Sequence, residues 1–331
     1  MLYKTTRNDQ DAVTVAHVLN GNREEEMGLY LPVRFPKYTE EEQKRLCAMS
    51  FNQRMAEILN LFFSTKLTLW DLDFSTGRYP VRLEEFPHRI FLAECWHNLD
   101  GQYALLEQNL LQLLGVQTGK AGSWVKIAVR MAVLAGILGE RQDWNGASVD
   151  LVMVAGDFTV PISAWYLREM GFPVGNIICC CNENNQLWEL ICHGQMRTDG
   201  TVLHTFIPEA DVALPVNLER LIFGCGGREE TMRYLHCVSG GAAYSVSEAM
   251  MAQLNTVFGR MASNLVLKLY LDERPVSAEL KNYMEELASL TDKLTVEISR
   301  GGEDAPCVRV CHADGSFTGL AFHGVPGGHE F

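Results

Sequence analysis

The chain has 331 residues, of which 47% are hydrophobic and 21% are charged, and its formal net charge at pH 7 is -13. This length allows two or three domains with buried cores. The acidic balance argues against nucleic acid as a partner, because neutralising phosphates needs a basic surface. No apolar run reaches the roughly 18 residues that span a bilayer, and the N-terminal stretch has no apolar signal core. We therefore expect a cytoplasmic protein with no membrane contact.

The first half of the chain predicts helices and one short strand. Thr39 is a candidate N-cap, because acidic residues follow it and apolar residues then recur at helical spacing to about Phe63. Residues 89–95 (RIFLAEC) predict an apolar strand. Helices are expected over 101–114 and 124–138, and the second of these is apolar enough to be buried.

Residues 149–181 carry the clearest architectural signal. A buried strand (149–155), a turn at Gly156, a helix ending at Met170 and a second buried strand (176–181) follow one another. This strand–helix–strand unit predicts a parallel sheet with helices on its faces. Such folds bind anions where a glycine turn leads from a strand into a helix, although one glycine is equally typical of a simple tight turn.

The last third of the chain changes character. The tract 224–227 (GCGG) is typical of a hinge, and helices are expected over 228–237 and 245–258. The elements predicted after them are a strand at 265–271, a helix at 277–290 with Ser277 as N-cap, and strands at 294–298, 307–312 and 317–322. This order predicts a small independent α/β domain.

The ten cysteines include no C-x-x-C pair, so neither a dithiol redox centre nor a zinc knuckle is indicated. Cys307 and Cys311 would be ~13 Å apart on one strand, which is too far for a disulfide. We expect reduced, mostly buried thiols. A metal site is the alternative, with candidate ligands Cys192, His193, Cys225, His236 and Cys237. Their spacing matches no known ligand pattern, so we expect no metal.

Six short stretches before residue 224, taken in order, resemble threonine synthase, a pyridoxal-phosphate (PLP) enzyme of fold type II. The stretches are 3–7 (YKTTR, like Y-x-S-T-R), 28–32 (GLYLP, like G-L-Y-V-P), 50–62 (like S-Y-x-x-x-A-x-x-I-L-x-x-F), 149–160 (like V-D-F-V-V-P-S-G-N-F-G-N), 182–185 (NENN, like the N-E-N-D of A-T-N-E-N-D) and 215–223 (PVNLERLIF, like P-S-N-F-E-R-L-L-F). The resemblance implies an α/β fold whose large domain has a parallel sheet, as in the β subunit of tryptophan synthase.

The family segment that holds the catalytic lysine reads E-L-F-H-G-P-T-L-A-F-K-D, and residues 94–105 stand in its place. His97 matches the family histidine, but Ala104 stands at the position of the Schiff-base lysine. A methyl group can neither form an aldimine nor move protons. The chain then runs from Gly115 to Trp124 without the family's mobile lobe. The resemblance therefore implies no catalytic residue and no bound cofactor.

The phosphate cradle of the family is also altered. That cradle has two glycines and two asparagines, and here Asp157, Thr159 and Val160 replace three of these four residues. A carboxylate at Asp157 would repel phosphate, and branched side chains would obstruct a close approach of the backbone. Ligand binding without chemistry is still expected at the matching positions, which are His97, Gly156, Asp157, Phe158, Thr159, Asn182 and Glu183. Structural roles explain them equally well, since Glu183 and Asn184 could cap the following helix.

A second resemblance covers the end of the chain. Residues 288–297 (ASLTDKLTVE) and 322–331 (FHGVPGGHEF) resemble the N-terminal thioredoxin-like domain of the alkyl hydroperoxide reductase flavoprotein subunit, in the half without a redox C-x-x-C. This implies a thioredoxin-like domain with a cis bond before Pro306. Because that family continues into a further helix, an uncovered apolar sheet face is expected. Such a face favours self-association or a protein partner through the C-terminal domain.

The predicted regions are a threonine-synthase-like N-terminal region (1–80), an α/β large-domain remnant (81–223), a hinge (224–244) and a thioredoxin-like domain (245–331). The favoured interpretation is a catalytically inactive, threonine-synthase-like protein that binds a ligand or a protein.

Two alternatives stay open. The first is a PLP-dependent lyase that uses another lysine, for which Lys66, Lys120 and Lys126 are nearest in the sequence. The second is a redox protein that uses Cys225 or Cys307 as a lone thiol.

Overall fold

The structure is a computed structural model that describes residues 1–20, 28–72, 81–94, 102–116, 123–141, 148–257, 264–289, 293–301 and 305–324. It divides into two compact units, Met1–Glu84 with Leu92–Phe258, and Glu85–Phe91 with Gly259–Phe331. This division lies later in the chain than residue 245, where the sequence placed it. The reason is that helix α10 (Glu248–Val257) packs on α8 (Gln186–His193) and α9 (Leu218–Gly240) of the first unit.

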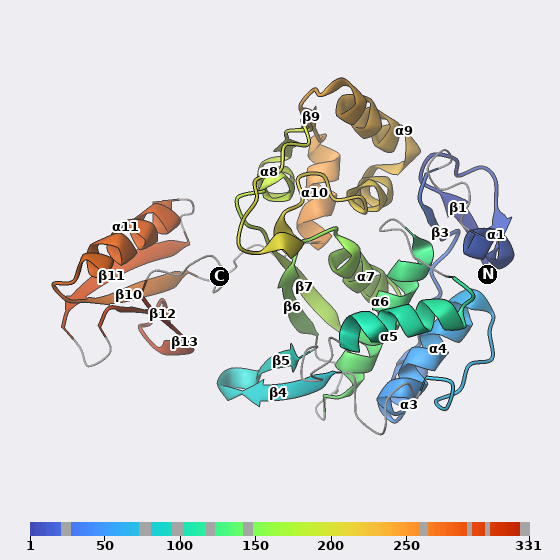
Figure 1. The fold of residues 1–331 in the computed structure, drawn as a ribbon, viewed down its shortest axis with the longest axis horizontal. Helices are drawn as coiled ribbons and strands as arrows, with labels where there is room; N and C mark the ends of the chain where they lie inside the picture. The colour runs from blue at the N-terminus through green and yellow to red at the C-terminus, as the bar shows by residue number, and fades with distance from the viewer. Residues whose placement is uncertain are drawn as a thin grey trace. The chain divides into compact units, whose positions relative to one another are not determined.

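The N-terminal segment forms a small antiparallel sheet, drawn in blue in Figure 1. Its elements are β1 (Leu2–Thr5), β2 (Val13–Thr14), α1 (Val15–Asn20) and β3 (Tyr30–Pro32), with strand order β2-β1-β3. Tyr3 in β1 is fully buried, and its hydroxyl donates to the carbonyl oxygen of Phe62, 2.6 Å away. This bond ties the sheet to helix α4 (Phe51–Phe63).

The single helix expected from Thr39 to Phe63 is two helices, α3 (Glu40–Cys47) and α4. Thr39 caps α3 as predicted, and its hydroxyl accepts from the backbone N–H of Glu42 at 3.3 Å. The single-helix prediction is wrong because Ser50 forms a second capping box with Gln53, which starts α4 as a new helix.

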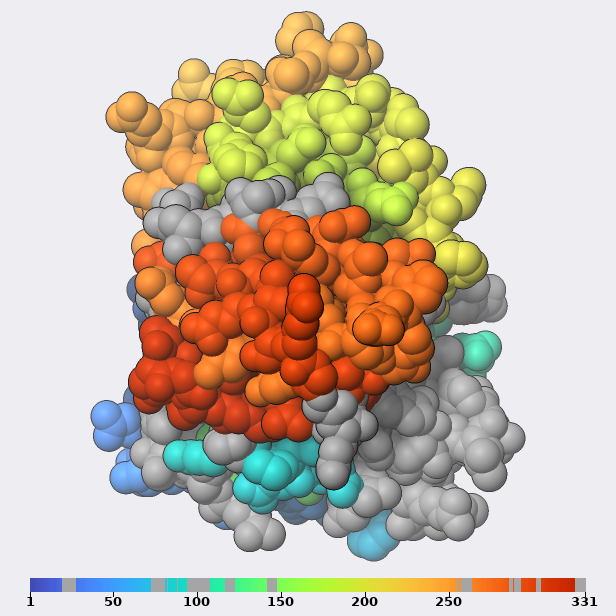
Figure 2. Space-filling view, turned by 90° about the vertical axis from the view of Figure 1, so that its left-hand side faces the viewer, coloured from blue at the N-terminus to red at the C-terminus, as the bar shows by residue number. Residues whose placement is uncertain are grey.

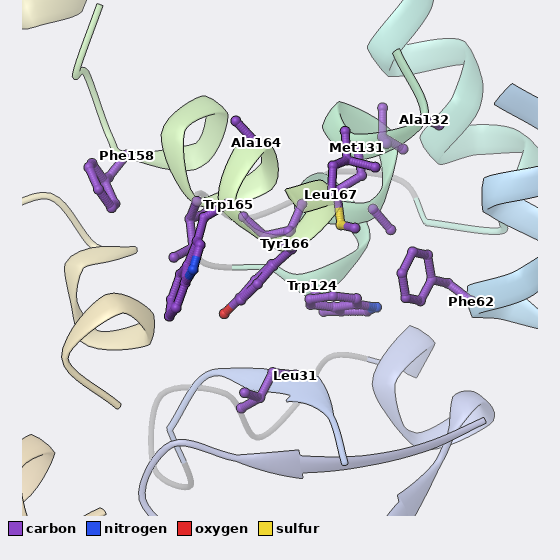
Figure 3. Close-up of a cluster of buried hydrophobic side chains, with 14 of the residues drawn as sticks. Leu31, Phe62, Trp124, Met131, Ala132, Phe158, Ala164, Trp165, Tyr166 and Leu167 are labelled. Atoms are coloured by element: carbon purple, nitrogen blue, oxygen red, sulfur yellow. The ribbon is translucent and has the colours of Figure 1, made fainter. Parts of the chain in front are cut away.

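Helix α6 (Trp124–Gly139) is the centre of the core of the first unit, as its apolar sequence predicted. It packs between α4 and α7 (Thr159–Glu169). Figure 3 shows the fully buried Trp124 with Phe62 on one side and Tyr166 on the other. Their ring centroids lie 5.3 Å and 6.0 Å from that of Trp124. Helix α5 (Gln102–Leu113) also contacts α6.

Strands β6 (Val149–Val154) and β7 (Val174–Cys180) are parallel and joined by α7, so the predicted strand–helix–strand unit is confirmed. Helix α7 packs on one face of this two-stranded sheet. Side chains of the other face are open, with Val152 67%, Val154 45% and Ile178 41% exposed. The prediction of buried strands is therefore wrong for one face of the sheet, because residues alternate between a covered and an open face.

The remaining elements of the first part of the chain are short or kinked. The strand predicted over 89–95 is β5 (Ile90–Glu94), which pairs with β4 (Arg82–Phe86), and β8 (Gln195–Met196) pairs with β9 (Tyr244–Ser245). Most of the predicted hinge, 224–244, is helical in α9, and only Gly227 interrupts the helix, with φ 71° and ψ -169°. A glycine tolerates this conformation because it has no Cβ.

The second unit contains a four-stranded mixed sheet with one helix. Its elements are β10 (Leu265–Leu271), α11 (Pro275–Ser289), β11 (Leu294–Arg300), β12 (Cys307–His312) and β13 (Phe317–His323). The strand order is β11-β10-β12-β13, in which β10 is parallel to β11 and antiparallel to β12, and β12 is antiparallel to β13. The predicted strands and helix are confirmed. Helix α11 begins before Ser277, however, and the Ser277 hydroxyl donates to Asp272 at 2.6 Å.

The two faces of this sheet differ in chemistry. Leu267 and Leu269 pack with Leu280 and Met284 of α11 in a small core. Lys268 lies between these leucines in β10 and so points to the opposite face, where its ammonium is 3.7 Å from the carboxylate of Glu297. Arg309, opposite Lys268, lies over the rings of Tyr270 and Phe317. The expected apolar open face is therefore charged along its middle.

The peptide bond between Ala305 and Pro306 is cis, as predicted. Within the described residues, no helix is long and apolar enough to cross a membrane.

Candidate functional site

Four of the six stretches that resemble threonine synthase meet in one buried polar network in the first unit. They are residues 3–7, 28–32, 149–160 and 215–223, and they are joined by side-chain hydrogen bonds. The network has two halves, one around Glu219 and one around Arg220.

Glu219 in the first turn of α9 is only 5% exposed and accepts three hydrogen bonds. The guanidinium of Arg7 donates to both carboxylate oxygens, from Nε at 3.0 Å and from Nη2 at 2.9 Å. The hydroxyl of Thr6 also donates to this carboxylate, while it accepts from the backbone N–H of Leu29 at 2.9 Å. These bonds raise the pKa of Arg7 above its ordinary value, because they hold its charged form against partial burial.

Arg220 is fully buried and connects β3 to the loop before α7. Its Nε and Nη2 donate to the carbonyl oxygen of Tyr30, at 3.0 Å and 2.7 Å, and its Nη1 donates to the side chain of Asn217. The amide of Asn217 donates in turn to the hydroxyl of Thr159 at 3.0 Å and to the carbonyl oxygen of Asp157 at 3.2 Å. Thr159, a candidate ligand-binding residue, is thus held within the fold.

The turn between β6 and α7 has an unusual backbone. Gly156 has φ 48°, and the fully buried Phe158 has φ 65°, which is rare for a residue with a side chain. At this turn the Asp157 carboxylate accepts from the backbone N–H of Thr159 at 2.9 Å, at the start of α7. A helix start has free N–H groups that attract anions. Here the chain's own carboxylate binds one of them.

Two further positions at the start of α7 offer no free donor. Pro161 has no N–H, and the N–H of the N-cap residue Phe158 already donates to the carbonyl oxygen of Ala155 at 2.9 Å. The helix start therefore has fewer donors for an external anion than an ordinary helix N-terminus.

Asn182 and its neighbours form a second polar cluster after β7. The Asn182 amide donates to Thr205 Oγ1 at 2.8 Å and to Asp211 Oδ1 at 2.7 Å. Asn184 binds the backbone of Leu203 in both directions, each at 2.8 Å. Glu183 is exposed. The prediction that Glu183 and Asn184 cap α8 is wrong, because the N-cap position is Asn185 and no side chain bonds there.

Residues 205–211 bring the two candidate groups together. A Cβ added to Gly156 would lie 3.1 Å from the carbonyl oxygen of Glu209, and Asp211 accepts from Asn182. The segment thus lies against the carboxyl ends of both β6 and β7, where open parallel sheets place ligands. Sequence reasoning missed this segment, since neither Thr205 nor Asp211 belongs to a recognisable motif.

The other predicted residues stay apart from this region or are not described. His97 and Lys120 lie outside the described residues. Ala104 is in α5, Lys66 is exposed after α4, and Lys126 is half-buried in α6. The nine described cysteines are free thiols. Among the described residues, no three His, Cys, Asp or Glu side chains gather as a metal site.

Comparisons with known proteins connect these observations. Residues 2–76 match the family model described as threonine synthase N terminus. Threonine synthase of Methylobacillus glycogenes is 27% identical over 110 residues, which are 32% of this chain and 23% of that protein. Threonine synthase-like 1 of Mus musculus is 33% identical over 79 residues, or 24% of this chain and 11% of that protein.

The crystal structure of PLP-bound threonine synthase from Brucella melitensis superposes with a TM-score of 0.65 and 14% identity, covering 91% of this chain and 78% of that one. The chain has a threonine synthase-like fold. The sequence matches span less than a quarter of the length of either curated relative. The polar network joins four of the stretches that resemble threonine synthase, and its hydrogen bonds connect separate elements of the first unit.

Proposed function

We propose that the chain is a threonine synthase-like protein without PLP chemistry, which acts by binding a small ligand or a protein partner. The observation that carries this proposal is the carboxylate of Asp157, which accepts the N–H of Thr159 at the start of α7. In a PLP enzyme of this fold, the matching turn would have to receive the cofactor phosphate.

The residues present do not fit PLP. A phosphate bound at the start of α7 would lie close to the Asp157 carboxylate. Two unit charges about 4 Å apart repel each other by about 4 kcal/mol at an effective dielectric of 20, which exceeds the ~1 kcal/mol that a helix start offers an anion. Ala104, at the place of the lysine, has no amine to bind the aldehyde.

No described feature favours the two alternatives. Lys66 is exposed after α4, and Lys126 is half-buried in α6. A reactive thiol needs a low pKa. Burial instead raises the pKa of Cys225 to about 12, and Cys307 is 1% exposed.

The proposal includes a thioredoxin-like assignment for the second unit. The strand order β11-β10-β12-β13, with a single parallel pair joined through α11, supports it. With no C-x-x-C in the chain, we propose a binding role for this unit, through self-association or a protein partner.

Absorption spectroscopy of the purified chain with and without PLP tests the first part of the proposal. We expect the spectrum of the free aldehyde and, after borohydride, no stoichiometric gain of cofactor mass. A stable aldimine band that reduces onto one lysine at one equivalent would overturn it. Lys66→Arg, Lys120→Arg and Lys126→Arg then identify the lysine. Scattered substoichiometric labelling, unchanged in these variants, marks ordinary surface amines.

A further inference from the structure

We propose that residues 202–206 form a docking surface for a partner polypeptide segment that carries apolar side chains flanked by Lys or Arg. The inference rests on the proposed binding role and deepens it, because it places one contact on the first unit and states the chemistry of the partner.

Three apolar side chains in this short segment are exposed. Val202 is 38%, Leu203 is 50% and Phe206 is 87% exposed. They lie between β8 and the 3-10 turn η2 (Pro208–Ala210), and the chain around residue 200, yellow in Figure 2, lies at the surface. Single exposed apolar residues are ordinary, but a group of them on one segment is typical of an interaction site.

The backbone that carries these side chains is fixed at two points. Leu203 donates its N–H to Asn184 Oδ1 and accepts from Asn184 Nδ2, each at 2.8 Å. Thr205 donates its N–H to Asp211 at 2.8 Å and its hydroxyl to the same carboxylate at 2.7 Å. Binding a partner therefore needs little ordering of this loop, and ordering is a main entropic cost of association.

The acidic residues near this segment favour a partner with basic residues. No Lys or Arg occurs between Arg197 and Arg220, while the exposed residues Asp199 and Glu209 each lie three residues from an end of the segment, and Glu183 is exposed as well. Glu183 lies between Asn182 and Asn184, whose side chains bind Thr205 and Leu203. Basic residues flanking an apolar anchor would complement this rim. A second copy of the chain, which has a net charge of -13, would place like charges against each other.

The test uses two labelled peptides with identical Leu and Phe anchors, one flanked by lysines and the other by glutamates. We expect the full chain to bind the lysine peptide more tightly, with an affinity that falls as salt rises. Leu203→Ser and Phe206→Ser should each weaken binding at least about tenfold, as for anchor residues of interfaces. Glu209→Lys should weaken the lysine peptide and strengthen the glutamate peptide.

Val152→Ser is the matched control, because Val152 is 67% exposed in the same unit but lies outside the segment. Equal affinity for the two peptides, or equal losses in Val152→Ser and Phe206→Ser, would overturn the inference. So would self-association in sedimentation that Phe206→Ser abolishes, which would make a second copy the occupant. Circular dichroism confirms that each variant is folded. The PLP spectrum is a separate readout, so failure here is distinguishable from failure of the proposed function.

Discussion

Replacing the buried carboxylate of Glu219 should destabilise the first unit strongly. Glutamine keeps the size of the side chain, but it removes the negative charge, and its amide N–H₂ would face one of the two Arg7 donors that now lie 2.9 Å and 3.0 Å from the carboxylate oxygens. Removing one partner of a buried ion pair costs about 3–5 kcal/mol. The side chain of Arg7 is 31% exposed, so water compensates part of this loss. We therefore expect about 3 kcal/mol for Glu219→Gln.

Thermal unfolding followed by tryptophan fluorescence measures this loss in the first unit alone. All six tryptophans of the chain lie in that unit, outside the ranges 85–91 and 259–331. A loss of about 3 kcal/mol corresponds to a fall in Tm of roughly 6–12 °C for a unit of this size.

The surface pair Arg45–Glu57 is the control. Its side chains are 53% and 32% exposed, and its N–O distance is 2.6 Å, comparable to that of Arg7–Glu219. Glu57→Gln should cost less than about 1 kcal/mol, as exposed pairs do. If Glu219→Gln and Glu57→Gln lower Tm equally, or if Arg7→Met combined with Glu219→Gln shows no coupling, the reasoning about the buried network is refuted.

Three further predictions concern other parts of the structure. Gly28→Ala should lower the free energy of unfolding by at least ~2 kcal/mol, because the φ of Gly28 is 89° and the added Cβ would lie 2.6 Å from Arg7 Cγ. The control Gly240→Ala in α9 adds a Cβ that meets no atom within 4 Å, so it should be neutral or slightly stabilising, and equal melting temperatures of the two variants would contradict this reasoning. Tyr166→Phe should leave the stability unchanged or raise it by up to ~1 kcal/mol, because the buried Tyr166 hydroxyl has no hydrogen-bond partner among the described residues. Tyr3→Phe removes the hydrogen bond to Phe62 and should cost ~1 kcal/mol, so a larger loss in Tyr166→Phe than in Tyr3→Phe would contradict the prediction. Hydrogen bonds from Thr205 hold the pKa of Asp211 below its ordinary value. Ionised Asp211 therefore stabilises the loop above about pH 4, and this contribution is lost as the pH falls through the folded pKa. Amide hydrogen exchange at Thr205 and Ile207, corrected for intrinsic rates, should accelerate in acid in the wild type, whereas in Asp211→Asn it should show no further acceleration.

Local patterns were sufficient for much of the fold. The strand–helix–strand unit and the second-unit elements β10 to β13 follow from runs of apolar residues and turn residues close together in the chain. The break between α3 and α4 could also be read locally, since Ser50 and Gln53 have the spacing of a capping box. In each case the residues that signal an element lie within its own short segment, although the strands that pair are far apart in the chain, as Val149 and Val174 are.

The sequence by itself also placed Ala104 where the related family has a lysine, and so predicted the loss of an amine. Only the tertiary structure decided what the other retained residues do. Thr6 and Glu219, 213 residues apart, share one hydrogen bond, and the Asn182 amide donates to Asp211, 29 residues away. Hydrogen-bond partners this distant, like the open face of β6 and β7, depend on how the elements pack, and local periodicity carries no information about packing across the fold.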